Sequence, residues 1–408
     1  MSHQELKVNG TISTIKGIGT SGPFFYPLQN PETGTTISEN PPALFQPLTI
    51  RGVKFANRVV VSPMCMYSCK DGSLTDFHLA HLGQFALRGA GLIFVEATAV
   101  LPNGRISTED SGIWDDKHVG PLKRVVDFVH SQGVKIGLQI AHAGRKASTR
   151  SPFTVEQNPQ LTMLVPKEDN GWPDNVVGPS PIPWDSEHAT PNQLSIDEIQ
   201  EIIDAFGKAA ERAIEAGFDV LELHFAHGYL LSEFFSPLSN ERTDEYGGNF
   251  ENRIRFGLEI AERVRTIWPT DRPLFARVSA TEWVDNNEQS WNIDQTVELA
   301  KSLKVLGVDL IDCSSGGNIS YQRIPVTPSF QVPFAERVRK EADIKTGAVG
   351  KITEAHQANE IVEQKQADLV FIGRAFLNNA GWVQKAAQQL GVKIAWPVQY
   401  HRRGNYQL

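Results

Sequence analysis

The sequence is poor in cysteine, and it lacks long apolar runs and any excess of basic residues. Three cysteines in 408 residues, Cys65, Cys69 and Cys313, are too few and too scattered for a disulfide framework or a cysteine-rich metal site. No stretch approaches the ~18 consecutive apolar residues of a membrane helix, and the first residues lack the charged-then-apolar pattern of a signal peptide. The formal net charge of −8, without a basic block, argues against binding nucleic acid or an anionic membrane. These absences predict a cytoplasmic protein.

The hydrophobic pattern predicts an α/β fold with one large core. At 40% hydrophobic residues the chain can bury a large core, and strand-like runs alternate with runs of helical period. The expected strands are 59–63, 92–97, 135–140, 220–224, 274–278, 310–313, 346–349 and 369–372. The expected helices are 78–88, 117–131, 196–216, 250–268, 293–306, 334–342, 354–363 and 382–390. Eight of each, in alternation, predict a single (β/α)₈ TIM barrel.

Three segments do not fit the regular alternation. Residues 1–43, with clusters of Gly and Pro, are expected to form an N-terminal extension before a barrel domain at 44–400, and residues 401–408 a C-terminal tail. The stretch 147–194 after the third strand is rich in Pro, Asn and Ser. Connections of that length are usually functional, so we expect a lid or rim over the C-terminal face of the barrel. Ser195 and Glu198 are spaced as a capping box that starts the next helix.

The most informative motif for chemistry is His224-Phe-Ala-His227-Gly-Tyr229, directly after an apolar strand. Two imidazoles and a phenol within a few residues can hold a developing oxyanion and deliver a proton. Histidines three residues apart also suit zinc, so the motif alone leaves the two alternatives about even.

Glycine-rich loops near the C-terminus predict a phosphate site. In barrels the loops after strands seven and eight commonly bind phosphate through backbone N–H groups. Here they contain Gly350, Gly373 and Arg374, and the guanidinium could bind phosphate in a bidentate way. Gly316 and Gly317, after strand six, are expected to add free N–H groups. The earlier G-x-G-x-x-G match at residues 17–22 is followed by prolines and not by a helix, so we reject a dinucleotide site there.

Several long motifs in order resemble the Old Yellow Enzyme family of flavin-dependent ene-reductases, and in particular its thermophilic-like branch. The resemblance covers about residues 44 to 400. The matching segments are Ser62-Pro-Met-Cys-Met-Tyr67, Gly112-Ile-Trp114, Gln139-Ile-Ala-His-Ala-Gly-Arg-Lys146, His224 to Leu231, Arg242 to Gly248 with Glu251-Asn-Arg253, and Phe371-Ile-Gly-Arg374.

The resemblance implies an FMN-dependent enzyme, reduced by NADPH or NADH and reoxidised by an activated alkene such as an enone, maleimide, nitroalkene or quinone-like compound. It assigns site residues by match. The flavin ring is lined by Pro63, Met64, Cys65 and Ala97, and its pyrimidine edge is bound by Gln139 and Arg277. The FMN phosphate is bound by Gly350, Gly373 and Arg374, near Gly316 and Gly317. The substrate is held by His224, His227 and Tyr67, and Tyr229 is the candidate proton donor. No metal is implied.

Two further assignments concern the flavin and the subunit interface. The thiol of Cys65 is expected to bond near the flavin C4=O and N5 and to tune its potential, whereas Cys69 and Cys313 are expected to be packing residues. The tail resembles a segment in which an arginine enters the neighbouring subunit's site, and Arg402 and Arg403 compete for that role. A homodimer or homotetramer is therefore expected.

Other classes remain open at this stage. Glu96 and Glu222 near strand ends could be the paired carboxylates of a glycoside hydrolase. His224 and His227 could bind the zinc of a hydrolase, or the chain could bind flavin without turnover. The related dienoyl-CoA reductases add a cysteine cluster and further domains that 408 residues with three cysteines do not provide. The colour and metal content of the purified protein separate these alternatives.

Overall fold

The computed structural model describes residues 28–284 and 289–400. Its central feature is a closed ring of parallel strands, because β3 pairs with both β13 and β4 and thereby joins the two ends of the sheet. The strands of the ring are β3 (Val59–Val61), β4 (Leu92–Ala99), β6 (Lys135–Ala141), β9 (Val220–Phe225), β10 (Leu274–Ser279), β11 (Leu310–Ser314), β12 (Lys345–Ala348) and β13 (Leu369–Ile372). The predicted TIM barrel is confirmed, with each strand at its expected place.

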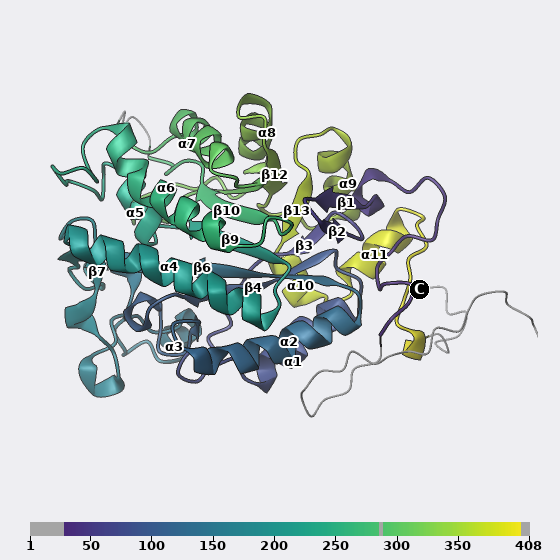
Figure 1. Cartoon of the computed structure of the whole chain (residues 1–408), viewed down its shortest axis with the longest axis horizontal. Coiled ribbons are helices and arrows are strands. Elements are labelled where there is room, and N and C mark those ends of the chain that lie inside the picture. Colours follow the sequence, from purple (N-terminus) through teal and green to yellow (C-terminus); the bar gives the residue numbers. More distant parts are fainter. Residues whose placement is uncertain (1–27, 285–288, 401–408) are drawn as a thin grey trace, which may run out of the picture.

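The main helices lie outside the ring of strands (Figure 1). They are α1 (Asp76–Ala86), α2 (Val119–Ser131), α4 (Ile196–Ala216), α6 (Phe250–Ile267), α7 (Ile293–Val305), α8 (Val332–Glu341), α9 (Ala355–Glu363) and α11 (Trp382–Gln389). Short helices are α3 (Pro152–Gln157), α5 (Leu230–Phe235) and α10 (Arg374–Asn378), and short strands are β1 (Leu48–Ile50), β2 (Val53–Phe55), β5 (Ser111–Gly112), β7 (Val177–Gly178) and β8 (Asn192–Gln193). The 3-10 helices are Ala43–Phe45, Pro102–Gly104, Asp116–His118, Gly144–Lys146, Lys167–Asp169, Pro173–Asn175 and Val398–Tyr400. None of the described helices is long and apolar enough to span a membrane.

Local sequence signals set the ends of α4, the longest of the described helices. The Ser195 hydroxyl accepts a hydrogen bond from the Glu198 N–H at 3.2 Å, and the Glu198 carboxylate accepts one from the Ser195 N–H at 2.8 Å. The predicted capping box is therefore confirmed. Gly217 ends the helix at φ 93°, a left-handed conformation that costs glycine little because it has no Cβ.

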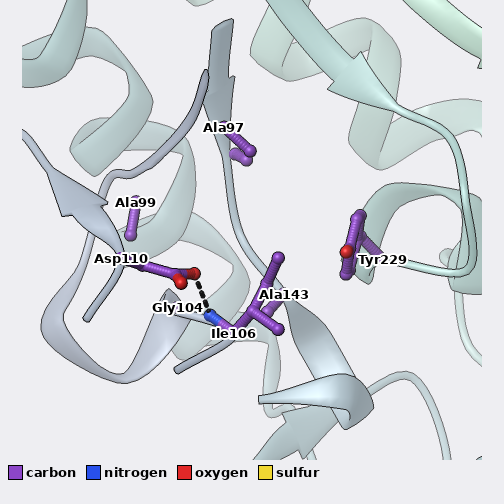
Figure 2. A pocket seen from close by; sticks show the side chains of 8 residues that line it. Ala97, Ala99, Gly104, Ile106, Asp110, Ala143 and Tyr229 are labelled. Atoms are coloured by element: carbon purple, nitrogen blue, oxygen red, sulfur yellow. Dashed lines mark hydrogen bonds between the residues drawn. The ribbon is translucent and has the colours of Figure 1, made fainter. Parts of the chain in front are cut away.

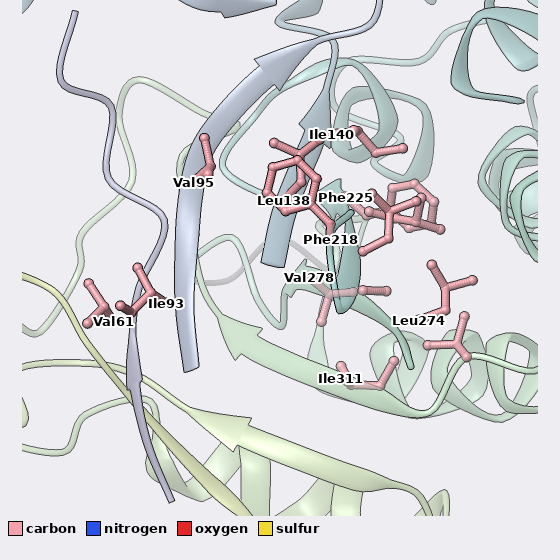
Figure 3. Close-up of a cluster of buried hydrophobic side chains, with 14 of the residues drawn as sticks. Val61, Ile93, Val95, Leu138, Ile140, Phe218, Phe225, Leu274, Val278 and Ile311 are labelled. Atoms are coloured by element: carbon pink, nitrogen blue, oxygen red, sulfur yellow. The ribbon is translucent and has the colours of Figure 1, made fainter. Parts of the chain in front are cut away.

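Alternation along the strands divides their side chains into two sets. One set points outward and packs against the helices in the largest buried cluster, which Figure 3 shows around Val95, Leu138, Phe225, Val278 and Ile311. The other set points into the barrel. Because successive residues of a strand face opposite sides, each strand contributes to both layers.

The barrel interior is closed by apolar side chains at the N-terminal ends of the strands. Ile50, Val53 and Phe55 of the β1–β2 hairpin pack there against inward-facing residues of the barrel, which are Val60, Leu92, Phe94, Val220, Phe275, Leu310, Leu369 and Phe371. The hairpin was missed from the sequence. The apolar side chains fill this end of the barrel. The polar inward-facing residues lie further along the strands, toward the C-terminal mouth, where barrel enzymes have their active sites.

The described part of the N-terminal extension is held against the end of the chain. Gln29 N donates to Ser131 O at the end of α2, and Gly34 N donates to Ala395 O. The Gln29 and Gln399 side chains are also hydrogen-bonded, at 3.0 Å. The segment before the barrel and the segment after it therefore pair with each other. The rejected glycine motif at 17–22 lies outside the described residues.

Candidate active site

A polar layer lies inside the barrel, above the apolar end. Gln139, Glu222, Arg277 and Asp312 come from four neighbouring strands. Gln139 is paired with Glu222 and Arg277 with Asp312, whereas Arg277 stands opposite His224, two residues beyond Glu222. Gln139 Nε2 donates to Glu222 Oε1 at 2.7 Å, and Arg277 Nε donates to Asp312 Oδ2 at 2.5 Å. Arg277 and Gln139, which motif matching assigned to the flavin, are thus brought together. The expected position of Arg277 inside a strand is confirmed, and its ion pair is buried.

The polar layer keeps unsatisfied hydrogen-bonding atoms. Arg277 Nη2, Glu222 Oε2 and Asp312 Oδ1 are buried and have no hydrogen-bond partner among the described residues. Burial, followed by repulsion from Asp312, raises the pKa of Glu222 to about 8. A buried guanidinium N–H without an acceptor costs free energy, so this group fits a ligand that brings an acceptor such as a ring carbonyl.

His224, His227 and Tyr229 converge at the mouth, as the sequence predicted. The His224 ring lies 5.1 Å from the His227 ring and 5.2 Å from the Tyr229 ring, between centroids. His224 is the last inward-facing residue of β9, while His227 and Tyr229 follow in the loop. His227 has φ 65° and its Nε2 lies 2.7 Å from Ser314 Oγ at the end of β11. That contact fixes the ring and leaves Nδ1 for a ligand.

Both imidazoles are neutral at ordinary pH. Burial, with a smaller contribution from Arg277, lowers the pKa of His227 to about 3. Burial and the neighbouring His227 lower the pKa of His224 well below its ordinary value, and its buried Nδ1 has no hydrogen-bond partner in the part of the chain that the structure describes. Neutral imidazoles can each donate one hydrogen bond to a carbonyl or nitro oxygen without forming a fixed ion pair.

Tyr229 borders a small pocket formed mainly by apolar side chains (Figure 2). Its other lining residues are Ala97, Ala99, Gly104, Ile106, Asp110, Ala141 and Ala143. The pairing of β4 with β6 shifts register between Val95 and Thr98, so Ala97 lies in an irregularity of the kind often found beside active sites. Burial, and next the proximity of Cys65, raises the pKa of Tyr229, which is therefore a protonated phenol.

The segment after β3 forms another wall of the mouth. Pro63, Met64, Cys65 and Tyr67 are half-buried, and Tyr67 has φ 48°. Burial, followed by the charges of Asp110 and Glu96, raises the pKa of Cys65, so its sulfur is a thiol that can donate a weak hydrogen bond. The Tyr67 ring makes an edge contact with Phe153 of α3 at 5.7 Å between centroids. The 147–194 excursion thus reaches this wall, as a lid or rim would.

The loops expected to bind phosphate follow β12 and β13, and their binding of phosphate stays a prediction, with one correction. Gly350 follows β12 with φ 125°, and Gly373 caps the start of α10. Arg374 is exposed, and no hydrogen bond or ion pair of its guanidinium is found within the described residues. The prediction of free N–H groups at Gly316 and Gly317 is wrong, because Gly316 N donates to Thr281 O and Gly317 N to Gln322 Oε1.

One cluster was not anticipated from the sequence. Cys69, His78 and Glu96 are buried, and their ligand-type atoms lie within 4.8 Å of one another. His78 Nδ1 accepts the Thr75 N–H at 3.1 Å, which places the imidazole proton on Nε2, toward Cys69 Sγ and Glu96 Oε2, each 3.5 Å away. With its proton on Nε2, His78 can donate to Glu96 and so form a polar contact between α1 and β4. The sequence carried no signal for it because the three residues are far apart and lie in different elements.

Two further predictions from the sequence concern paired carboxylates and the C-terminal arginines. Glu96 contacts His78, whereas Glu222 contacts Gln139, so the two carboxylates of the glycosidase alternative belong to separate clusters. Arg402 and Arg403 lie outside the described residues, and their entry into a neighbouring subunit stays a prediction.

Comparison with known proteins identifies the family. Residues 43–393 match the model of the NADH:flavin oxidoreductase / NADH oxidase family. An NADPH dehydrogenase of Bacillus subtilis is 47% identical over 361 residues, which cover 88% of this chain and 98% of that protein. An NADH:flavin oxidoreductase of Gibberella zeae is 46% identical over 393 residues, covering 93% and 94%.

Solved structures agree with this assignment. Morphinone reductase superposes with a TM-score of 0.70 at 28% identity, covering 88% of this chain and 92% of that chain. The old yellow enzyme homologue from Zymomonas mobilis gives a TM-score of 0.70 at 26% identity, covering 86% and 94%. The chain belongs to the NADH:flavin oxidoreductase / NADH oxidase family, the Old Yellow Enzyme family, and is a flavin oxidoreductase.

Proposed function

We propose that the protein is an FMN-dependent NAD(P)H oxidoreductase that reduces the C=C bond of activated alkenes. The observation that carries the proposal is the convergence of two neutral imidazoles and one protonated phenol, next to a small pocket at the mouth of the barrel. Such a set can hold a carbonyl or nitro oxygen and supply a proton to the neighbouring carbon.

The residues present fit FMN. The buried, unpartnered Arg277 Nη2 is a donor for an acceptor on the pyrimidine edge of the ring, and Gln139 lies in the same layer. The half-buried segment of Pro63, Met64 and Cys65 would line the ring. The exposed guanidinium of Arg374, beside the loops of Gly350 and Gly373, would bind the phosphate. We no longer assign the phosphate to the N–H groups of Gly316 and Gly317, since both are used within the protein.

When bound, FMN supplies hydride to the β-carbon of the alkene after its reduction by a nicotinamide. The protein's own groups act on the other end of the conjugated system. His224 and His227 donate hydrogen bonds to the substrate oxygen, which draws electron density away from the β-carbon and stabilises the negative charge that develops. Tyr229 then delivers its phenolic proton to the α-carbon. Tyr67, on the segment after β3, is proposed as a further contact to the substrate.

NADPH is the proposed physiological donor. Relatives in Bacillus subtilis and Geobacillus thermodenitrificans are NADPH dehydrogenases at 47% and 46% identity, and a structure of morphinone reductase contains tetrahydroNAD, so both nicotinamides occur among the relatives. Assembly into a homodimer or homotetramer remains part of the proposal and is open to direct measurement by light scattering.

The test combines cofactor analysis with half-reactions. Purified protein is expected to show the visible absorption of oxidised flavin, to contain one FMN per chain and no stoichiometric zinc, and to be bleached anaerobically by NADPH. A panel of cyclic enones, maleimides and nitroalkenes should then restore the colour. Zinc at the two histidines, or flavin that no alkene reoxidises, would overturn the proposal in favour of a zinc hydrolase or a flavin-binding protein without turnover.

A further inference from the structure

Lys146 occupies an unusual position for a lysine. It is half-buried at the end of the 3-10 helix Gly144–Lys146, and its Nζ donates to two backbone carbonyls, His227 O at 2.8 Å and Gly317 O. The ammonium also lies over two aromatic rings, 4.5 Å from the centroid of Trp184 and 5.6 Å from that of Tyr229. No salt bridge of Lys146 with a carboxylate is found in residues 28–284 and 289–400.

The two carbonyls belong to different loops of the mouth. His227 lies between β9 and α5, and Gly317 lies in the loop after β11. The loops touch through their backbones: a Cβ on Gly228 would stand 2.2 Å from Gly317 O, and one on Gly317 would stand 2.5 Å from His227 C. Glycine at both positions permits this approach, but it supplies no side chain to hold it.

Other groups complete the junction. Trp184 of the excursion donates its indole N–H to Gly317 O at 3.0 Å, so Gly317 O accepts from Lys146 and Trp184 together. On the other side, Ser279 Oγ accepts the His227 N–H at 2.8 Å and donates to Gly316 O at 2.7 Å. Among the charged groups here, Lys146 is the one whose hydrogen bonds reach both loops; the neighbouring Arg145 guanidinium donates to Asn318 O of the second loop at 2.7 Å.

We propose that Lys146 is a positioning residue, whose protonated amine ties the His227 loop to the Gly317 loop and thereby orients the His227 imidazole and the Tyr229 phenol toward the substrate. The inference rests on the proposed function of the site. Because charge-assisted hydrogen bonds are about twice as strong as neutral ones, the junction is firm only while Nζ carries its proton. Trp184 of the excursion packs its ring against this amine.

The charges that face Lys146 come from each element around it. Burial and, next, Arg145 on its own helix favour loss of the proton, whereas Asp185 of the excursion and the ionised form of Glu233 of α5 favour its retention, and the balance lowers the pKa of Lys146 to about 7. His227 and Tyr229, on the loop that it binds, do not change charge near neutral pH. The Lys146 contact should therefore weaken as pH rises through the neutral range.

The experiment measures binding of a non-ionisable cyclic enone to the oxidised flavoprotein, through the perturbation of the flavin spectrum, at several pH values. For wild type, affinity should fall as pH rises through about 7. Lys146→Met should bind about 10–100-fold more weakly at low pH and show no such pH dependence, the loss expected for a charged hydrogen bond. Lys146→Arg should restore affinity and hold it at high pH, because arginine stays charged.

A matched control is Lys304→Met. Lys304 Nζ also donates to two backbone carbonyls, Ala342 O and Asp343 O, but at the outer surface of the barrel. It should leave both affinity and pH dependence unchanged. The inference would be overturned if Lys146→Met bound the enone with wild-type affinity or kept the wild-type pH dependence. If that variant fails to fold, wild-type affinity that does not change with pH would overturn it. Wild type that binds no flavin or no enone would instead refute the proposed function.

Discussion

At the scale of single residues, the site depends on groups kept uncharged by burial. His224 and His227 are neutral, Tyr229 is a protonated phenol and Cys65 is a thiol. Uncharged donors in a largely closed site favour a neutral substrate whose oxygen becomes negative during the reaction. A substrate that is already an anion would have to lose its hydration shell on binding, which costs free energy. The proposed reaction needs such uncharged donors, because it starts from a neutral alkene and builds negative charge on the oxygen.

The histidine assignment predicts weaker binding of oxygen ligands. His224→Ala and His227→Ala should each weaken binding of a phenol to the oxidised enzyme by about 10-fold or more, because each removes one hydrogen bond to the ligand oxygen. A phenolate stacked on the flavin gives a long-wavelength charge-transfer band, and its titration measures the affinity. An unchanged band in the double variant would remove the histidines from the site.

The phenol of Tyr229 should matter in one half-reaction only. Tyr229→Phe should leave flavin reduction by NADPH nearly unchanged and slow reoxidation by a weakly activated enone by ~10²–10⁴, the range of a positioned acid. Nitroalkenes should be affected less, since a nitronate can be protonated in water. Stopped-flow absorbance follows both steps; equal slowing of both would indicate general distortion, and normal enone turnover would mean that another group supplies the proton.

Cys65 is predicted to tune the flavin. Cys65→Ala should shift the midpoint potential by on the order of 20 mV, since a weak hydrogen bond of about 1 kcal/mol that differs between redox states corresponds to that for a two-electron couple. FMN content and melting temperature should stay at wild-type values. Potentials that coincide within error would make Cys65 a packing residue.

At the scale of elements, the loop between β13 and α10 is predicted to hold the FMN phosphate. Arg374→Ala should weaken FMN retention ~10–100-fold, the equivalent of about 1.5–3 kcal/mol for a charge-assisted contact. Dialysis followed by flavin quantification measures it. The matched control is Arg337→Ala on α8, where the guanidinium pairs with Glu341 and Asp294 away from the mouth. Equal flavin retention in Arg374→Ala and wild type would show that the phosphate lies elsewhere.

Most of the fold was predictable because local sequence patterns determine its helices and strands. Strand and helix periods gave all the major elements of the barrel, and the Ser195 and Glu198 capping box gave the start of α4. The β1–β2 hairpin was not predictable in the same way, since strands of three residues carry too short a pattern to be distinguished from a turn.

The site was predictable where its residues are neighbours in sequence, as in the segment from His224 to Tyr229. It was not predictable where it depends on long-range contacts. Lys146 meets carbonyls 81 and 171 positions away, and Gln322 folds back onto the Gly317 N–H, which the glycine pattern had suggested was free. Glycine marks where backbones approach closely, but it does not show which partner approaches.

At the scale of the whole molecule, buried carboxyl groups should shape stability. Glu233 is buried in α5 beneath the mouth, and burial raises its pKa from 4.5 to about 8. The folded state then binds more protons than the unfolded state between these values, so stability is fully present at low pH and falls as pH rises toward 8. One such group contributes a slope of at most about 1.4 kcal/mol per pH unit.

Glu233→Gln should therefore reduce the loss of stability between pH 5 and 8, because glutamine keeps the oxygen that accepts the Arg145 N–H but cannot ionise. Urea denaturation of the FMN-loaded protein at several pH values measures the slope. A variant that loses stability with pH as steeply as wild type would show that Glu233 is ionised in the folded state.

The central claim, transfer of hydride to the β-carbon with protonation at the α-carbon, is tested most directly by isotope position in the product. The protein is mixed anaerobically with deuterium-labelled NADPH and a cyclic enone, and in a second run with unlabelled NADPH in D₂O; the saturated product is then examined by NMR. The account predicts deuterium on the β-carbon in the first run and on the α-carbon in the second. Reoxidation of the flavin with an intact C=C bond, or deuterium from NADPH on the α-carbon, would contradict it.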